Sequence, residues 1–226
     1  MVIGNGLIAS LFKENYRNDV VFFASGVSNS LEKDLAQFER EENLIRETLE
    51  ENTDKIFVYF STCSIYDSSK VGSDYVLHKL KMEQIIKNNA PQYLILRVSN
   101  AVGKGGNPNL LINYLMRSAK EGNTINVHTK ATRNLIDAED IKKIIEEILM
   151  SESLNKIVNI AYPQNYSVVE ILEIIERFYQ KKLDLNLVKS GSSYEINIPE
   201  TEHYFRDNNL TSKENYLLSI LNKYYA

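Results

Sequence analysis

Short apolar runs recur along the chain and alternate with stretches in which apolar residues follow the spacing of one helix face. Four runs are continuous and rich in β-branched and aromatic residues, and they predict strands at residues 20–24, 56–60, 93–98 and 157–161. Runs of this kind are typical of parallel strands covered on both faces.

Between these runs lie stretches in which the apolar residues have helical spacing, at residues 31–49, 77–86 and 141–149. The first predicted apolar face consists of Leu31, Leu35, Phe38, Ile45 and Leu49, and the second of Leu77, Leu80, Ile85 and Ile86. Strands that alternate with helices indicate a parallel sheet with right-handed crossovers, so the predicted fold class is α/β.

The last sixty residues follow a different pattern. Ser167 is a plausible cap at the start of a helix, a strand is predicted at 183–188, and a tyrosine-rich helix at 213–225. We therefore predict a sheet domain formed by 1–103 with 138–161, and a smaller lobe formed by 104–137 with 162–226.

Composition excludes several classes of protein. The net charge of −4 argues against nucleic acid or an anionic membrane as the main partner. The lone cysteine, Cys63, cannot form an internal disulfide and indicates a reducing, cytoplasmic setting. The three histidines are far apart, which argues against a metal site. No apolar run is long enough to span a bilayer. The first twelve residues lack Lys and Arg and are interpreted as structure rather than a signal peptide.

Residues 1–9 predict a short strand, a tight turn at Gly4-Asn5-Gly6 and the start of a helix near Leu7 that ends near Asn15. Glycines in such a turn let the backbone approach a pyrophosphate, and a helix start offers unpaired N–H groups to an anion. An ordinary turn between strand and helix is the alternative.

Tyr75 and Lys79 are four residues apart and share a helix face. A nearby ammonium favours the tyrosinate form, which suits acid–base chemistry. In a chain with fourteen tyrosines, a chance surface pair is the competing interpretation. The segment 60–66, with Ser61, Thr62 and Ser64, follows a predicted buried strand, and ligands bind at the carboxyl ends of such strands.

Together these segments resemble the extended short-chain dehydrogenase/reductases, also called the NAD-dependent epimerase/dehydratase family, which has a Rossmann-like parallel sheet. Thr62, Tyr75 and Lys79 match its Ser/Thr and Tyr-x-x-x-Lys catalytic positions. The segment 96–103 is similar to its R-x-x-N-x-x-G stretch, and Asn100 would touch a nucleotide sugar. The segment 133–140 resembles its R-D-F-x-x-V-x-D stretch, and Arg133 would meet the substrate phosphates.

The resemblance assigns the remaining site residues, with NAD or NADP as cofactor and no metal. Ser64 is a further substrate contact. The cofactor contacts are Gly4, Asn5, Gly6, Leu7, Ile8, Ala24, Ser25, Gly26, Ser61, Tyr75 and Lys79.

The chain departs from the family in two places. Between the helix after Gly6 and the strand at 20–24, the two further strands and the helix of the family are missing, so the sheet loses an edge and the adenosine side of the cofactor site is expected to be open. Where the family's dehydratases carry Asp-Glu after the threonine, this chain has Cys63 and Ser64, which argues against dehydration. A buried thiol at Cys63 is interpreted as inert packing.

The resemblance implies an NAD(P)-dependent enzyme acting on a nucleotide-diphosphate sugar, as in the biosynthesis of surface polysaccharides. Tyr75 would exchange a proton with the sugar, Lys79 would hold the nicotinamide ribose and Thr62 would donate to the same sugar oxygen. Both a keto-sugar reductase and an epimerase fit, with reduction favoured because an open adenosine side weakens cofactor retention. The alternative is a nucleotide-binding or regulatory protein without activity. Family members often pair two helices per subunit into a dimer, and helices 31–52 and 74–89 are the candidates here.

Overall fold

Five parallel strands form the central sheet in the order β1-β2-β3-β4-β9. The computed structural model describes residues 1–14, 17–105, 110–151 and 153–226. The strands of the sheet are β1 (Val2–Ile3), β2 (Val20–Phe23), β3 (Ile56–Thr62), β4 (Tyr93–Val98) and β9 (Lys156–Ile160). The predicted strands and the α/β class are confirmed. β1 is an edge of the described sheet, as expected from the absence of the two further strands that the family has after its first helix.

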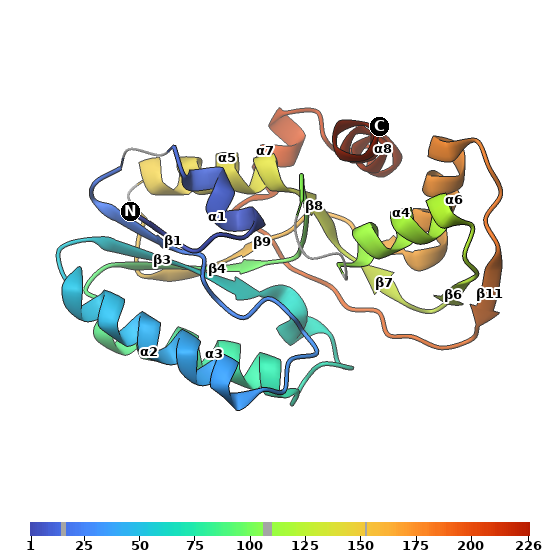
Figure 1. Cartoon of the computed structure of the whole chain (residues 1–226). Helices are drawn as coiled ribbons and strands as arrows, with labels where there is room; N and C mark the ends of the chain where they lie inside the picture. Colours follow the sequence, from blue (N-terminus) through green and yellow to red (C-terminus); the bar gives the residue numbers. More distant parts are fainter. Residues whose placement is uncertain (15–16, 106–109, 152) are drawn as a thin grey trace.

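Helices cover both faces of this sheet (Figure 1). They are α1 (Leu7–Phe12), α2 (Leu35–Glu51), α3 (Asp74–Asn89) and α5 (Ala138–Met150). Alternate residues of a strand point to opposite faces, so Val21 and Phe23 pack with α2 and α3 whereas Val20 and Phe22 join the core beneath α1 and α5. The sheet is therefore a three-layer α/β structure.

Most of the remaining elements lie beyond the carboxyl ends of the strands, whereas the helix Glu202–Asp207 lies beside α5 (Figure 1). The helices there are α4 (Leu111–Glu121), α6 (Val168–Tyr179), α7 (Glu202–Asp207) and α8 (Lys213–Tyr225). The short strands pair as β5 (Asn100–Val102) with β8 (Leu135–Asp137), β6 (Ile125–His128) with β11 (Leu185–Val188), and β7 (Thr132–Arg133) with β10 (Tyr166–Ser167). The exact boundaries of a separate lobe stay a prediction.

Local signals in the C-terminal region match the structure. The Ser167 side chain accepts from the Glu170 backbone N–H while the Glu170 carboxylate accepts from the Ser167 N–H, which forms a complete capping box. The predicted helix at 213–225 is α8 and the predicted strand at 183–188 is β11. The helix after Gly6 ends at Phe12. Its expected end near Asn15 lies outside the described residues.

Two predicted helix faces are partly wrong. Phe38, Ile45 and Leu49 are buried against the sheet, but α2 begins only at Leu35, which is 70% exposed, and Leu31 precedes the helix and is also exposed.

On α3, Ile85 and Ile86 are buried while Leu77 and Leu80 face outward, with Leu77 54% exposed. The apolar side chains of α2 and α3 therefore divide between the sheet and an outer surface, a division that helical spacing alone does not resolve.

No helix of the described residues is long and apolar enough to cross a membrane. Within the same residues, no group of three or more His, Cys, Asp or Glu side chains is arranged to hold a metal ion.

Candidate active site

A cavity of about 820 Å³ lies where the sheet strands end. Its wall contains residues that directly follow β1, β2, β3 and β4, together with Tyr75 and Lys79 from α3. Because the strands are parallel, their carboxyl ends meet at one edge, where α/β proteins bind ligands. Every site residue predicted from the sequence lines this cavity except Arg133.

The glycine turn brings two loops into close contact. Gly4 has φ +126°, and a Cβ placed on it would lie 2.4 Å from the carbonyl oxygen of Ala24. A side chain therefore cannot be accommodated there without moving the backbone. A Cβ on Gly6 would meet nothing within 4 Å. The turn thus packs tightly against the loop after β2 while leaving open space beside Gly6 for a ligand.

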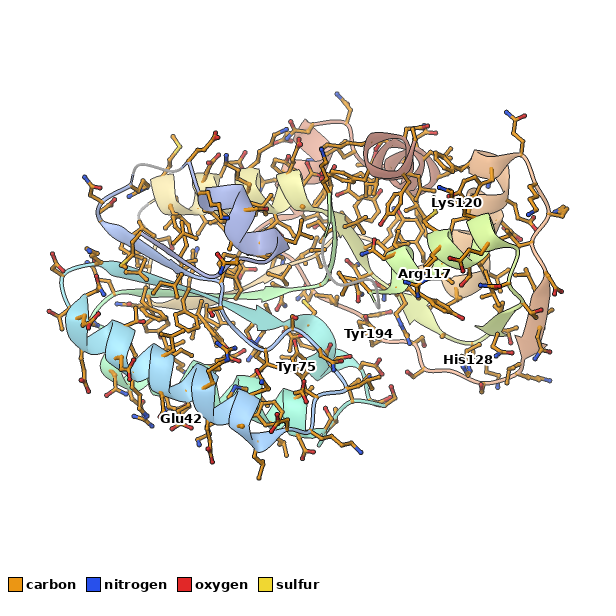
Figure 2. All side chains as sticks on the ribbon, in the orientation of Figure 1. Glu42, Tyr75, Arg117, Lys120, His128 and Tyr194 are labelled. Carbon is orange, nitrogen blue, oxygen red and sulfur yellow. The ribbon has the colours of Figure 1, made fainter. Side chains whose placement is uncertain are left out.

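Tyr75 lies in the first turn of α3, which begins after Ser73, whose hydroxyl accepts from the Val76 N–H at 3.3 Å. The tyrosine ring is largely buried, and the Lys79 Nζ lies 6.0 Å from the ring centroid. Among the described residues, no group forms a hydrogen bond with the Tyr75 hydroxyl. Figure 2 shows Tyr75 at the end of α3 that faces the segment carrying Tyr194. Tyr75 and Lys79 therefore both line the cavity, and the Tyr75 hydroxyl is available to a ligand.

A buried carboxylate holds the catalytic candidate Lys79. Glu41, from α2, is fully buried, and its Oε1 accepts from the Lys79 Nζ at 3.0 Å and from the Tyr59 hydroxyl at 2.7 Å. Its Oε2 accepts from the Val27 N–H at 2.6 Å and lies 3.1 Å from Nε2 of His78. Both carboxylate oxygens therefore have two partners, and Lys79, only 2% exposed, is fixed in place.

The charge state of this cluster follows from its contacts. Burial works to raise the pKa of Glu41, but the Lys79 charge and the hydrogen bonds from His78, Val27 and Tyr59 outweigh it and lower the pKa to about 2. Burial, followed by the charge of Glu41, raises the pKa of Tyr59 well above its usual value of 10.0. Glu41 is therefore ionised and Tyr59 is protonated near neutral pH.

Lys79 retains donor capacity toward the cavity. Its ammonium has three N–H groups, of which one is donated to Glu41 and one to the Tyr59 hydroxyl at 3.1 Å. A Cβ on Gly26 would lie 2.5 Å from Nζ, so the loop after β2 passes directly over the ammonium. One N–H remains for a ligand hydroxyl.

Thr62 ends β3 and caps the short 3-10 helix Cys63–Tyr66, because its Oγ1 accepts from the Ser64 N–H at 3.0 Å. Its own hydroxyl proton remains available as a donor. Ser61 donates to Glu83 at 2.6 Å. Cys63 is buried, its thiol donates to the carbonyl of Arg97, and burial raises its pKa to about 12. These properties support the interpretation of Cys63 as a packing residue.

Asn100 and Arg133, both predicted to grip the substrate, differ in position. Asn100 lines the cavity, and its Nδ2 donates to the Asn134 carbonyl at 2.7 Å, which fixes the side chain between β5 and β8. Arg133 does not line the cavity. It lies in β7, which pairs with β10, and its Nη1 donates to the carbonyl of Thr132 at 2.6 Å. Its role as a contact to the substrate phosphates stays a prediction.

The sequence did not indicate several residues of this site, and four of them bear on its chemistry. Arg40, Lys104 and Tyr194 line the cavity, and Glu41 lies behind Lys79. Tyr194 lies in the long segment between β11 and α7 (Figure 2). Burial raises its pKa, an effect that the Arg133 charge partly offsets.

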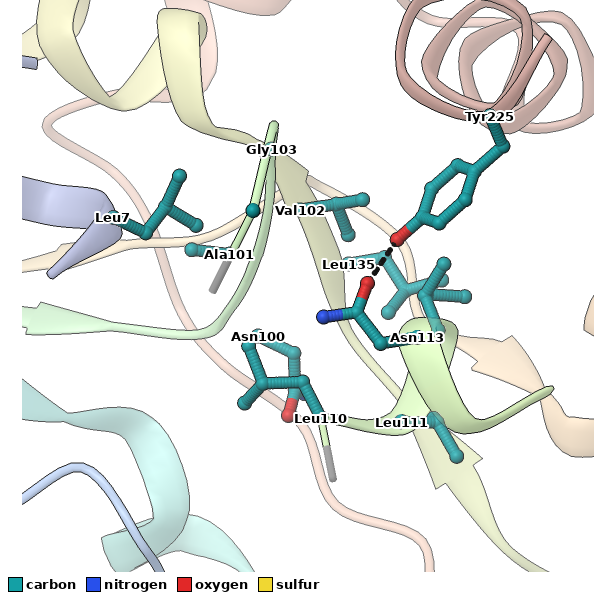
Figure 3. Close-up of a pocket in the computed structure, with 12 residues that line it drawn as sticks. Leu7, Asn100, Ala101, Val102, Gly103, Leu110, Leu111, Asn113, Leu135 and Tyr225 are labelled. Carbon is teal, nitrogen blue, oxygen red and sulfur yellow. Dashed lines mark hydrogen bonds between the residues drawn. The ribbon is translucent and has the colours of Figure 1, made fainter. Parts of the chain in front are cut away.

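A second, much smaller pocket adjoins the cavity and shares Leu7, Asn100, Ala101 and Leu110 with it (Figure 3). On its far side the Tyr225 hydroxyl donates to Oδ1 of Asn113 at 2.5 Å. Its volume of about 10 Å³ is the size of one water molecule, so it is not a ligand site.

A parallel sheet, a glycine turn after its first strand and a Tyr-x-x-x-Lys pair at the cavity define a Rossmann-like α/β protein. The profile of the NAD dependent epimerase/dehydratase family matches residues 4–161, and the chain belongs to this family. No curated protein sequence matches the chain significantly.

Solved structures share the fold. UDP-glucuronic acid 4-epimerase from Bacillus cereus, in complex with UDP-glucuronic acid and NAD, is 18% identical with a TM-score of 0.66, over 96% of this chain and 79% of that chain. dTDP-glucose 4,6-dehydratase from Bacillus anthracis, with NAD, is 18% identical with a TM-score of 0.67, over 98% and 81%. RMD from Pseudomonas aeruginosa, with NADPH, is 16% identical with a TM-score of 0.68, over 98% and 86%.

Proposed function

We propose that the chain is an NAD(P)-dependent enzyme that modifies nucleotide-diphosphate sugars, with Tyr75, Lys79 and Thr62 as its acid–base group. The observation that carries the proposal is the position of Tyr75, which lines a large cavity beside the buried Lys79 and whose hydroxyl has no hydrogen-bond partner among the described residues. The family membership and the epimerases and dehydratases among the solved structures support it.

The cavity fits a dinucleotide. The space beside Gly6 would accept a pyrophosphate, and the free N–H of Lys79 would hold the hydroxyls of the nicotinamide ribose. A bound dinucleotide would supply hydride transfer to or from the sugar carbon. Tyr75 would exchange a proton with the sugar oxygen at that carbon, and Thr62 would donate a hydrogen bond to the same oxygen. Asn100 would contact the nucleotide part of the substrate.

Reduction of a keto sugar is the favoured reaction. Since β1 is an edge of the described sheet, no neighbouring strand encloses the adenosine side, which should weaken retention of a tightly held cofactor. Epimerisation requires such retention, because the same cofactor is oxidised and reduced within one turnover. Dehydration is disfavoured by Cys63 and Ser64: Cys63 has a pKa of about 12, and neither side chain carries a carboxylate.

A turnover assay separates these reactions. The enzyme is incubated with a UDP- or dTDP-linked 4-keto sugar and NADH or NADPH, and cofactor absorbance is followed together with sugar analysis. Stoichiometric loss of the reduced cofactor supports reduction. Sugar conversion without net cofactor consumption supports epimerisation instead.

The second candidate is a nucleotide-binding or regulatory protein without catalytic activity, which the shortened sheet favours. Tyr75→Phe distinguishes it, because the variant keeps the ring and removes only the hydroxyl. We expect turnover to fall by about a hundredfold or more while cofactor affinity is retained. Turnover that survives the substitution unchanged would rule out the catalytic role of Tyr75.

A homodimer is part of the proposal. α2 and α3 lie side by side (Figure 1) and present Leu35, Leu77 and Leu80 to the outside. Exposed leucines on adjacent helices are suited to pairing with the same helices of a second copy. A role in the biosynthesis of surface polysaccharides and a cytoplasmic location also remain proposals, the latter because the lone Cys63 forms no disulfide.

A further inference from the structure

The segment 189–201 connects β11 with α7 and brings Tyr194 to the wall of the cavity. A hydrogen bond fixes the segment just before this tyrosine, where the Ser192 hydroxyl donates to Oδ1 of Asp67 at 2.8 Å. The N–H of Asp67 in turn donates to the Ser64 carbonyl at 3.2 Å. The segment is therefore attached to the short 3-10 helix that directly follows β3.

A buried asparagine joins Tyr194 to two further residues of the cavity wall. Asn134 is 1% exposed, and its carbonyl accepts from Nδ2 of Asn100 at 2.7 Å while its Oδ1 accepts from the Ser99 hydroxyl at 2.8 Å. The Asn134 Nδ2 donates to Oδ1 of Asn165 at 2.9 Å, and Nδ2 of Asn165 donates to the Tyr194 carbonyl. Ser99, Asn100 and Tyr194 all line the cavity. They form one wall because Asn134 holds all three in place.

The Tyr194 hydroxyl is a hydrogen-bond donor. Its oxygen accepts from the Asn134 N–H, while its own O–H has no acceptor within the part of the chain that the structure describes. Burial raises the pKa of Tyr194, the charge of Arg133 opposes this effect and the charge of Asp67 adds to it. The phenol is therefore protonated near neutral pH, and its proton is available to a ligand.

This wall lies on the side of the cavity where the sugar would react. Val98, directly before Ser99, pairs with Thr62 in the register of β3 and β4. The end of α3 that carries Tyr75 faces the segment with Tyr194 (Figure 2). The glycine turn, where the cofactor pyrophosphate would bind, follows β1, which is two strands away from β3. Phenol, amide and hydroxyl groups along one wall are suited to the hydroxyl and keto oxygens of a sugar.

We infer that Tyr194 is a substrate-binding residue, which donates a hydrogen bond to the sugar of the nucleotide-diphosphate sugar and does not contact the cofactor. This inference rests on the proposed function and adds to the site a contact from the segment 189–201. Tyr194 would thereby help to select the sugar, because a sugar without an oxygen at that position leaves the phenol without a partner.

Calorimetric titration of the full chain and of Tyr194→Phe with UDP-glucose, UDP and NADH tests the inference. The substitution keeps the ring and removes only the hydroxyl. We expect the affinity for UDP-glucose to fall about fivefold, which is the loss of one hydrogen bond, while the affinities for UDP and NADH stay unchanged. UDP-glucose and UDP differ only in the glucosyl group, so the comparison isolates the sugar contact. dTDP-glucose and dTDP are titrated in the same way.

Tyr166→Phe is the matched control, because the Tyr166 hydroxyl donates to the Lys213 carbonyl at 2.7 Å and Tyr166 does not line the described cavity. It should leave all affinities unchanged. An equal loss for UDP and UDP-glucose in Tyr194→Phe would overturn the inference, since Tyr194 would then contact the nucleotide. A loss of NADH affinity would also overturn it, since the hydroxyl would then serve the cofactor.

Unchanged binding of the sugar nucleotides by Tyr194→Phe would overturn the inference and leave the proposed function intact. Failure of both UDP-glucose and dTDP-glucose to bind the unaltered protein would overturn the proposed function as well.

Discussion

The buried carboxylate of Glu41 predicts a large loss of stability in the variant Glu41→Gln. Glutamine has nearly the same size but leaves the Lys79 ammonium, 2% exposed, without a counter-charge. Removing one partner of a buried ion pair costs about 3–5 kcal/mol. The depressed pKa of Glu41, from 4.5 to about 2, gives roughly 3 kcal/mol at about 1.4 kcal/mol per pKa unit. The cost of breaking a buried ion pair and the pKa shift of Glu41 therefore both give a destabilisation of about 3 kcal/mol.

The loss should depend on pH. Because the folded-state pKa of Glu41 is depressed, its stabilisation is fully present above 4.5 and is lost as the pH falls from 4.5 toward about 2. Near pH 7 the variant should therefore unfold about 3 kcal/mol more easily than the unaltered protein, and the difference should narrow by about 2 kcal/mol between pH 5 and pH 3.

Urea unfolding followed by far-UV circular dichroism measures this difference at each pH. The control is Glu42→Gln, the next residue on α2, whose carboxylate pairs with exposed Lys81 and Arg46 and should contribute less than about 1 kcal/mol. If the two variants were equally destabilised, or if the Glu41→Gln difference stayed constant from pH 5 to pH 3, the assignment of a buried, ionised Glu41 would be refuted.

Three further predictions follow from the same structure. Gly26→Ala places a methyl group 2.5 Å from the Lys79 Nζ and should lower the free energy of unfolding by about 1–3 kcal/mol; an unchanged urea midpoint would contradict this contact. Leu77→Glu combined with Leu80→Glu should convert a dimer to a monomer in sedimentation velocity, and a protein that is already monomeric would exclude the proposed interface. Because burial raises the pKa of Cys63 to about 12, a thiol reagent should modify it at pH 8 far more slowly in the folded protein than in urea, whereas equal rates would show an accessible thiolate.

Local signals predicted much of this fold. The buried strands, the glycine turn, the Ser167 cap and the final helix depend on residues close to one another in sequence, where spacing and side-chain type decide the structure. The Tyr75 and Lys79 pair belongs to the same category, because four residues of helix place both side chains on one face.

Other features depend on contacts between distant residues. Glu41 lies 38 positions from Lys79, and only the neighbouring positions of α2 and α3 bring them together. In the sequence, Glu41 is one acid in the run 39–42 and shows no sign of burial. Arg133 illustrates the reverse case: its motif matches the family, but the pairing of β7 with β10 places it outside the cavity wall. Leu77 shares its helical spacing with Ile85 and Ile86 but faces outward, because spacing does not show which face of a helix meets the sheet.

The short first strand has a consequence for the solubility of the folded protein. An edge strand presents unpaired N–H and C=O groups that can recruit a strand from another chain, and long, flat edges promote aggregation. At the β1 edge, only Val2 and Ile3 belong to the strand, and Gly4 turns the backbone away immediately afterwards. An edge of two residues is too short to template a foreign strand. The sheet can therefore end at β1 without promoting aggregation through this edge.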